Sequence, residues 1–242
     1  MKKILKILLY SGGFDSWVID KLWKPDHKVY VNMHTKYSEA ELERIKKLDD
    51  VTIIDFPLSQ WERDDAIIPL RNLYLVMAIC NTFKDDDLDI CLGATAGDRV
   101  LDKSYYFADK ASDLLSYLYQ PQHWYPKGRK INVNVSFKSK TKTELLTDYI
   151  NMGGSIEEAF KGSFSCYNPD EFGKECWKCK PCFRKYVAFK TCGYNFDECV
   201  DKEVYTYLHK EIIPQIQSGT YGRASEESKI LKIYEELEKK YK

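Results

Sequence analysis

The stretch Ser11–Ser16, SGGFDS, combines residue types that can hold a phosphorylated ligand. It follows a short apolar run, so we expect it to join a strand to a helix whose first amide groups lack partners inside the helix. Such amides attract anions, and glycines let the backbone approach a phosphate closely. Ser11 and Ser16 can add hydroxyl donors, and Asp15 can hold a Mg²⁺ ion that accompanies the phosphates. A plain strand–turn–helix junction, in which Asp and Ser cap the helix, is the alternative interpretation.

Two common phosphate loops do not fit this stretch. The P-loop requires GxxxxGK[ST], and no lysine follows the glycines here; the dinucleotide loop requires GxGxxG, which is also absent. The stretch therefore predicts a phosphate loop of a different kind.

A second group of reactive residues is a set of closely spaced cysteines, with nine, two and two residues between them: Cys166, Cys176, Cys179 and Cys182. Four thiolates can surround a zinc ion tetrahedrally and leave no position for a substrate, which predicts a structural Zn²⁺ site in a loop-rich segment. The CxxCxxC part is also a spacing that holds iron–sulfur clusters, so this alternative stays open.

Elements that can position these residues alternate along the first half of the chain. Strand-like apolar runs are Ile4–Tyr10, Lys28–Met33, Val51–Phe56, Leu88–Gly93 and Ile131–Phe137. Helix-like segments are Asp15–Leu22, Ser38–Leu48, Pro69–Thr82, Asp109–Tyr119 and Lys142–Met152, and a further one, Phe183–Thr191, follows the cysteines. This alternation predicts an α/β fold, with an open twisted parallel sheet and flanking helices.

Three segments are expected along the chain. Residues 1–160 would form the nucleotide-binding domain, residues 161–196 a zinc-binding lobe, and residues 197–242 a charged, helical C-terminal extension. The last part of the extension, YEELEKKYK, has the pattern of an amphipathic helix, which can serve as a homodimer contact.

Composition limits the classes of partner. The 242 residues carry 37 Lys plus Arg against 37 Asp plus Glu, so the basic excess of a nucleic-acid binder is absent. No apolar run approaches the roughly 20 residues of a membrane helix. The start, MKKILKILLY, resembles a signal peptide but is interrupted by Lys6 and lacks a cleavage site, so we interpret it as a strand. We expect a cytoplasmic protein that does not bind a membrane.

The SGGFDS stretch resembles the pyrophosphate loop of the ATP pyrophosphatase superfamily, whose members cleave ATP between the α- and β-phosphates. Together with IPLRN, LGATAGD, KTKTELL and SCY…CWKCKPC, it resembles the 7-cyano-7-deazaguanine synthase family over about Ile4 to Thr191. The resemblance implies an adenine-nucleotide alpha-hydrolase-like, Rossmann-like fold. It also implies ATP, Mg²⁺ and Zn²⁺ as cofactors, and a deazapurine acid and ammonia as substrates of a nitrile-forming ligase.

The resemblance also implies roles for individual residues. The nucleotide and its metal would be held by Tyr10, Ser11, Gly12, Gly13, Asp15 and Ser16. Asp15, Ser16 and Arg71 would take part in catalysis. The substrate would be bound by Arg71, Asn72, Tyr106, Asp109, Lys142 and Arg184.

Two stretches depart from the family pattern. His34 stands where the family has a Tyr-Gly-Gln-like turn, and we interpret this single histidine as a surface or packing residue. The family's purine-associated Ser-Gly-Tyr-Pro-Asp appears only loosely, in Lys103–Asp109. Other hypotheses therefore remain: a ligase for another carboxylate, a tRNA-modifying relative, or a nucleotide-binding module without turnover.

Overall fold

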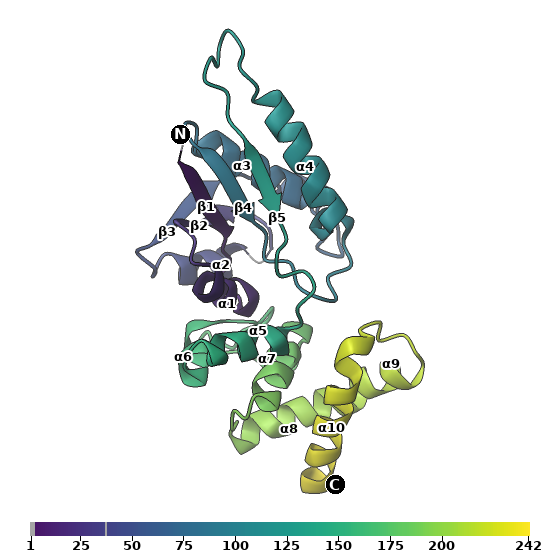
Figure 1. The fold of residues 1–242 in the computed structure, drawn as a ribbon. Coiled ribbons are helices and arrows are strands. Elements are labelled where there is room, and N and C mark those ends of the chain that lie inside the picture. Colours follow the sequence, from purple (N-terminus) through teal and green to yellow (C-terminus); the bar gives the residue numbers. More distant parts are fainter. Residues whose placement is uncertain (1–2, 37) are drawn as a thin grey trace. The chain divides into compact units, whose positions relative to one another are not determined.

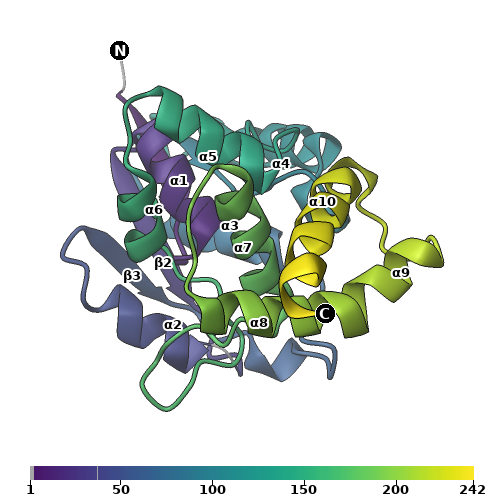
Figure 2. The same cartoon turned by 90° about the horizontal axis from the view of Figure 1, so that it is seen from below.

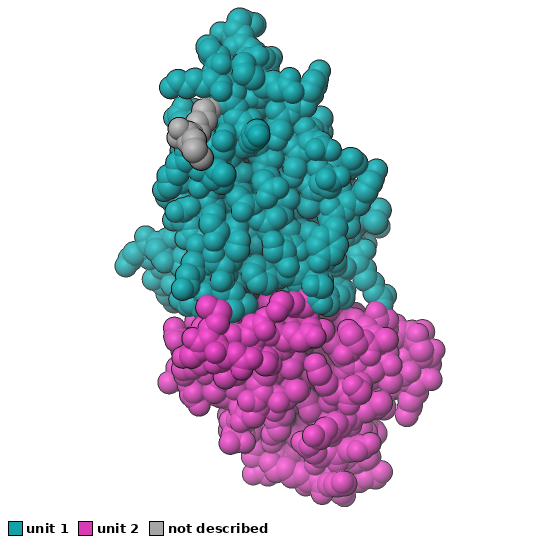
Figure 3. Space-filling view, viewed as in Figure 1, with its two compact units in different colours: residues 1–12, 19–139 teal, residues 13–18, 140–242 magenta. Residues whose placement is uncertain are grey.

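The computed structural model describes residues 3–36 and 38–242. Met1 and Lys2, at the signal-peptide-like start, and Tyr37 lie outside the described residues. The chain divides into two compact units, coloured separately in Figure 3: unit 1 comprises residues 1–12 and 19–139, and unit 2 residues 13–18 and 140–242. The three segments expected from the sequence stay a prediction, because compactness alone does not show which parts fold independently.

Unit 1 contains a parallel five-stranded sheet in the order β3-β2-β1-β4-β5 (Figure 1). The strands are β1 (Ile4–Leu9), β2 (His27–Asn32), β3 (Val51–Asp55), β4 (Asp87–Cys91) and β5 (Ile131–Asn134). The strand order reverses between β1 and β4, and ligands of open α/β sheets bind outside the carboxyl ends of the strands at such a point. The predicted α/β fold class is therefore confirmed.

Alternating side chains of the strands build a core on each face of the sheet. On one face, Ile7, Val31 and Ile90 are buried in a cluster with residues of α3 (Arg71–Thr82) and α4 (Tyr105–Leu118). On the other face, Leu8 and Tyr30 pack with Ile19 of α1 (Phe14–Trp23) and Ile45 of α2 (Ser38–Ile45). Two short 3-10 helices, Ser59–Trp61 and Leu101–Lys103, complete the unit.

Unit 2 is helical apart from the cysteine segment (Figure 2). Its helices are α5 (Lys142–Asn151), α6 (Ile156–Gly162), α7 (Lys180–Thr191), α8 (Glu198–Tyr207), the π-helix η3 (Leu208–Ile212), α9 (Ile213–Gln217) and α10 (Ala224–Tyr241). A core of buried side chains joins α7, α8, η3 and α10, including Phe183, Tyr186, Leu208 and Ile230. The predicted helical extension is confirmed, and it shares a core with the helix that follows the cysteines.

Side-chain caps explain where several helices of unit 2 begin. Thr141 and Glu144 form a reciprocal capping box at α5, and Ser155 and Asp197 cap α6 and α8. Pro214 at the start of α9 has no N–H, so it interrupts the α-helical bonding pattern next to the π-helix. Among the described residues, no helix combines the length and apolar character required to cross a membrane.

Several predicted boundaries differ from the structure by one to four residues, and two of these differences have a clear physical cause. The expected strand Ile131–Phe137 ends at Asn134, because the chain turns there, with the Lys138 N–H donating to Val135 O at 2.9 Å. The expected helix at Asp109 begins at Tyr105, because Ser104 accepts from Phe107 N and caps the helix. The second shift places the whole aromatic run Tyr105–Phe107 on the first turn of a helix.

Candidate functional site

The first half of the glycine loop lies in unit 1, at the carboxyl end of β1. The Tyr10 N–H donates to Val29 O at 2.8 Å, which extends the β1–β2 pairing up to the loop. Ser11 is exposed, and Gly12 has φ +70°, a conformation that favours glycine. A Cβ on Gly12 would also lie 3.4 Å from Ile45 Cδ1 of α2. Gly12 therefore lets the chain turn sharply at the carboxyl end of β1, and Ser11 lies at the surface beside it.

The second half of the loop lies in unit 2, where one of its residues forms an ion pair with a residue far along the sequence. Asp15, in the first turn of α1, accepts from Lys142 Nζ at 2.5 Å. Lys142 is the first residue of α5, and its ammonium group also lies 5.2 Å from the centre of the Phe14 ring. The structure therefore brings together two of the predicted site residues, one from the loop and one from the KTKTELL run.

Ser16 and Phe14 mainly anchor the start of α1. Ser16 is buried, and its hydroxyl donates to Gly13 O at 3.1 Å. Phe14 is also buried and packs edge-to-face on Phe189 of α7, with ring centres 5.5 Å apart. The Phe14 N–H points to Ser165 Oγ at 3.4 Å, next to the first cysteine. These contacts fix the helix start whose amides were expected to face phosphate.

Arg71 and Asn72 begin α3 in unit 1, after Leu70, which has a left-handed φ of 61°. The Asn72 N–H donates to Asp102 Oδ2 at 3.1 Å, while its own side chain is only 5% exposed and its Nδ2 has no partner among the described residues. A buried donor without a partner is costly, and an acceptor atom of a ligand at this position would satisfy it. Asp102 was missed from the sequence, because nothing local indicates that it reaches a residue 30 positions earlier.

Arg71 lies within electrostatic range of Glu41 on α2. Burial raises the pKa of Glu41, against the lowering effects of a hydrogen bond from Tyr30 and of the charges on Arg44 and Arg71. In the part of the chain that the structure describes, the Arg71 guanidinium makes no hydrogen bond or ion pair of its own. It can therefore receive an anion with its planar pair of donors.

Among the described residues, no hydrogen bond or ion pair joins Tyr106 or Asp109 to these residues. Both lie on α4, where Tyr106 is 74% exposed and the side chain of Asp109 is 66% exposed and paired with Lys110 at 3.2 Å. Arg184 lies on α7 in unit 2, where its charge acts on Tyr207 and Tyr221 of the C-terminal extension. The substrate-binding roles of these three residues stay predictions.

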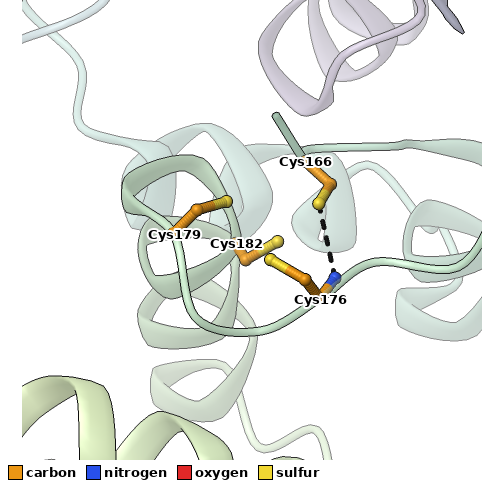
Figure 4. A group of neighbouring side chains, drawn as sticks. All are labelled: Cys166, Cys176, Cys179 and Cys182. Atoms are coloured by element: carbon orange, nitrogen blue, oxygen red, sulfur yellow. Dashed lines mark hydrogen bonds between the residues drawn. The ribbon is translucent and has the colours of Figure 1, made fainter. Parts of the chain in front are cut away.

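The cysteine cluster has the geometry of a metal site. The sulfur atoms of Cys166, Cys176, Cys179 and Cys182 all lie within 4.8 Å of one another (Figure 4). Cys179 is the N-cap of α7 and Cys182 lies in its first turn, where the helix dipole favours thiolates. Hydrogen bonds from Cys166, which has the larger effect, and from Cys182 hold the pKa of the Cys179 thiol far below its usual range. Four converging sulfur ligands fit a tetrahedral Zn²⁺ with no open position.

A buried ion pair supports the cluster from within unit 2. Lys185 Nζ lies 2.9 Å from Glu175 Oε2, and it also donates to Ser163 O at 2.6 Å and Phe160 O at 3.1 Å. Burial lowers the pKa of Lys185, opposed by the charge of Glu175. The pair ties the segment before Cys176 to the helix that carries Cys182.

The parallel sheet, the glycine loop at its first strand and the four-cysteine group place the chain in the Rossmann-like class of α/β proteins with a cysteine metal-binding segment. Residues 48–193 match the family model described as queuosine biosynthesis protein QueC, and the chain belongs to this family. The matched range includes Arg71, Asn72, Lys142 and all four clustered cysteines, and it begins after the glycine loop.

Two curated proteins are similar to the chain at low identity. One is "7-cyano-7-deazaguanine synthase 1" of Colwellia psychrerythraea, 22% identical over 216 residues, with 76% of this chain and 93% of the relative covered. The other is "7-cyano-7-deazaguanine synthase 2" of Sulfurisphaera tokodaii, 23% identical over 232 residues, with 80% of this chain covered. The chain spans 47% of the length of this second relative. No solved structure matches the chain significantly.

Proposed function

We propose that this chain is an ATP-dependent ligase that converts 7-carboxy-7-deazaguanine and ammonia to 7-cyano-7-deazaguanine. The observation that carries the proposal is the SGGFDS loop at the carboxyl end of β1, in a chain of the QueC family. The names of both curated relatives support the product. ATP, Mg²⁺ and ammonia belong to the proposal.

The proposal assigns a task to the backbone amides of the loop, to Ser11 and Asp15, and to Arg71. The amides after Gly12 and the Ser11 hydroxyl would bind the outer phosphates of ATP, leaving the α-phosphate accessible to the substrate carboxylate. Asp15 would hold a Mg²⁺ that neutralises phosphate charge. Arg71 would bind a phosphate or the substrate carboxylate.

Lys142 gives the loop a second cation. Its ammonium group is paired with Asp15 and is mostly buried, so it is held close to the start of α1. When a nucleotide binds, the same ammonium group can turn from the carboxylate to a phosphate oxygen, which frees Asp15 for the metal. Stabilising the charge that develops on the phosphates is the main demand of adenylation.

Zn²⁺ would be bound by the four cysteines. It would cross-link the segment and would not take part in the reaction, because four protein ligands leave no coordination position for a substrate. The zinc-binding segment follows Ser165, which contacts Phe14 at the start of α1. A stable cysteine segment would therefore help to hold the start of the phosphate-binding helix.

The test is incubation of the purified protein with ATP, Mg²⁺, ammonia and 7-carboxy-7-deazaguanine, followed by mass spectrometry of the product and measurement of AMP. The nitrile and AMP are expected together. Lys142→Met should abolish most AMP formation, whereas Lys140→Met should not, since Lys140 is exposed in part and pairs with Asp148. AMP without a nitrile would instead favour a ligase for another acceptor, and no AMP with any acceptor would refute the enzymatic proposal.

A further inference from the structure

Three polar side chains form a hydrogen-bonded group at the carboxyl ends of β2 and β3, all within unit 1. His34 Nε2 lies 2.5 Å from Asp55 Oδ1, and Asn32 Nδ2 donates to the same oxygen at 2.9 Å. The His34 N–H also points to Asn32 Oδ1 at 3.3 Å. His34 is therefore held in place by the last residues of two strands.

The contacts define which ring nitrogen of His34 is available. Two atoms lie near His34 Nε2: Asp55 Oδ1 at 2.5 Å and Asn32 Nδ2 at 3.1 Å. The carboxylate can only accept, and the Asn32 amide donates to the same carboxylate at the shorter distance of 2.9 Å, so we assign the proton of the ring to Nε2. In the neutral ring, Nδ1 then has a free lone pair. Nδ1 has no partner among the described residues, and the side chain of His34 is 48% exposed. This is the arrangement of a base oriented by a carboxylate, with its accepting nitrogen open to a reactant.

The backbone at His34 is strained, with φ +57°. The segment around it is fixed by hydrogen bonds from Phe56 N to Asn32 O and from Leu58 N to Met33 O, both 2.9 Å. An ion pair as exposed as His34–Asp55, with 48% and 66% of the side chains accessible, contributes little to stability. Stability alone therefore does not account for the strained conformation, and such conformations cluster at functional sites.

The group lies at the same edge of the sheet as the glycine loop. Leu9 of β1 is in register with Val29 of β2, and Asn32 of β2 is in register with Asp55 of β3. Asn32 is three residues beyond Val29, as Gly12 is three residues beyond Leu9, and neighbouring strands are about 4.8 Å apart. His34 therefore follows the strand next to the loop, on the side of the sheet edge where ligands gather.

We propose that His34 is the general base of the ammonia-dependent step, and that Asp55 and Asn32 are its positioning residues. This inference rests on the proposed function. In the step, the nitrogen of ammonia forms a bond to the acyl carbon of the adenylated acid and becomes positively charged. His34 Nδ1 takes one proton from that nitrogen, and the bond from the acyl carbon to the phosphate oxygen breaks, so AMP leaves with the electron pair. The products are the amide, AMP and an imidazolium, which returns its proton to water.

The test separates adenylation from amide formation. Adenylation is followed as acid-dependent exchange of labelled pyrophosphate into ATP without ammonia, and amide formation is followed by mass spectrometry after ammonia is added. His34→Ala should leave the exchange rate within about 2-fold of the parent and lower amide formation by about 100-fold or more, the usual range for a lost general base. Added imidazole should restore part of the amide formation. Asp55→Asn should lower amide formation less, without rescue by imidazole.

His123→Ala is the matched control, because this histidine is exposed in unit 1 and lies far along the chain from the group. It should change neither rate. Unchanged amide formation in His34→Ala, or a parallel loss of exchange that imidazole does not restore, would overturn the role of His34 while leaving the proposed function intact. A parent protein that shows neither exchange nor amide would overturn both.

Discussion

Replacing Lys185 by methionine tests the buried ion pair that supports the cysteine segment. The side chains of Lys185 and Glu175 are only 1% and 9% exposed, so water cannot compensate for a lost partner. In Lys185→Met the carboxylate of Glu175 would keep its bond from Ser165 N but lose the ammonium group, and Ser163 O and Phe160 O would lose a donor. Methionine fills a similar volume, so the change is mainly electrostatic.

Removing one partner of a buried ion pair costs about 3–5 kcal/mol, because the other charge stays buried without compensation. For a chain of this size, each kcal/mol lowers Tm by roughly 2–4 °C, so we expect a decrease of about 6–20 °C. Urea unfolding followed by tryptophan fluorescence, with saturating Zn²⁺ in every sample, measures the free energy of unfolding directly. The double variant Lys185→Met/Glu175→Gln should recover part of the loss, because it removes the buried carboxylate charge.

Lys242→Met is the control for a lysine in an exposed pair. Lys242 and Glu238 pair at 3.1 Å with side chains that are 75% and 31% exposed. Such a pair contributes about 0–1 kcal/mol. If Lys185→Met changes the free energy of unfolding by no more than Lys242→Met does, the assignment of a structural role to the buried pair is wrong.

Three further predictions concern unit 2. Cys179→Ser should lower bound zinc measured by atomic absorption, whereas the exposed Cys199→Ser should not, and a parent protein without zinc would contradict the metal assignment. Tyr186→Phe should destabilise by about 1.5–3 kcal/mol in urea titrations, because its buried hydroxyl donates to Asp201 at 2.6 Å and hydrogen bonds to charged groups are strong. Thr141→Ala should cost about 1 kcal/mol by removing the capping box of α5, and a loss below a few tenths would argue against that cap.

Local sequence patterns were sufficient for features that depend on neighbouring residues. The apolar runs located all five strands. The strands β1, β2 and β4 bury neighbouring residues on both faces of the sheet, which requires apolar residues in succession, whereas the edge strand β5 buries only alternate residues. The cysteine spacing located the four-cysteine group, because three of its members lie within seven residues and a helix start brings them together. The helix boundary at Tyr105 was missed because a cap at Ser104 decided it.

Contacts between residues far apart in the sequence could not be predicted from local patterns. Asp15 and Lys142 are 127 residues apart. The sequence indicated each of them only as a separate candidate, Asp15 for binding a metal and Lys142 for binding an anion. His34 looked like an isolated surface residue, although the register of β2 and β3 places Asp55 beside it. Asp109, chosen from the sequence as a substrate contact, lies on an exposed helical face, whereas Asp102 reaches the start of α3.

The sequence by itself determined the parts of this protein: an α/β sheet, a glycine loop after the first strand, a group of four cysteines and a helical extension. Only the tertiary structure decided which charged groups meet, because strand register and helix packing set those distances and no local pattern encodes them. The pairing of Lys142 with Asp15 and of Asp55 with His34 are the two results of that packing on which the proposed chemistry depends.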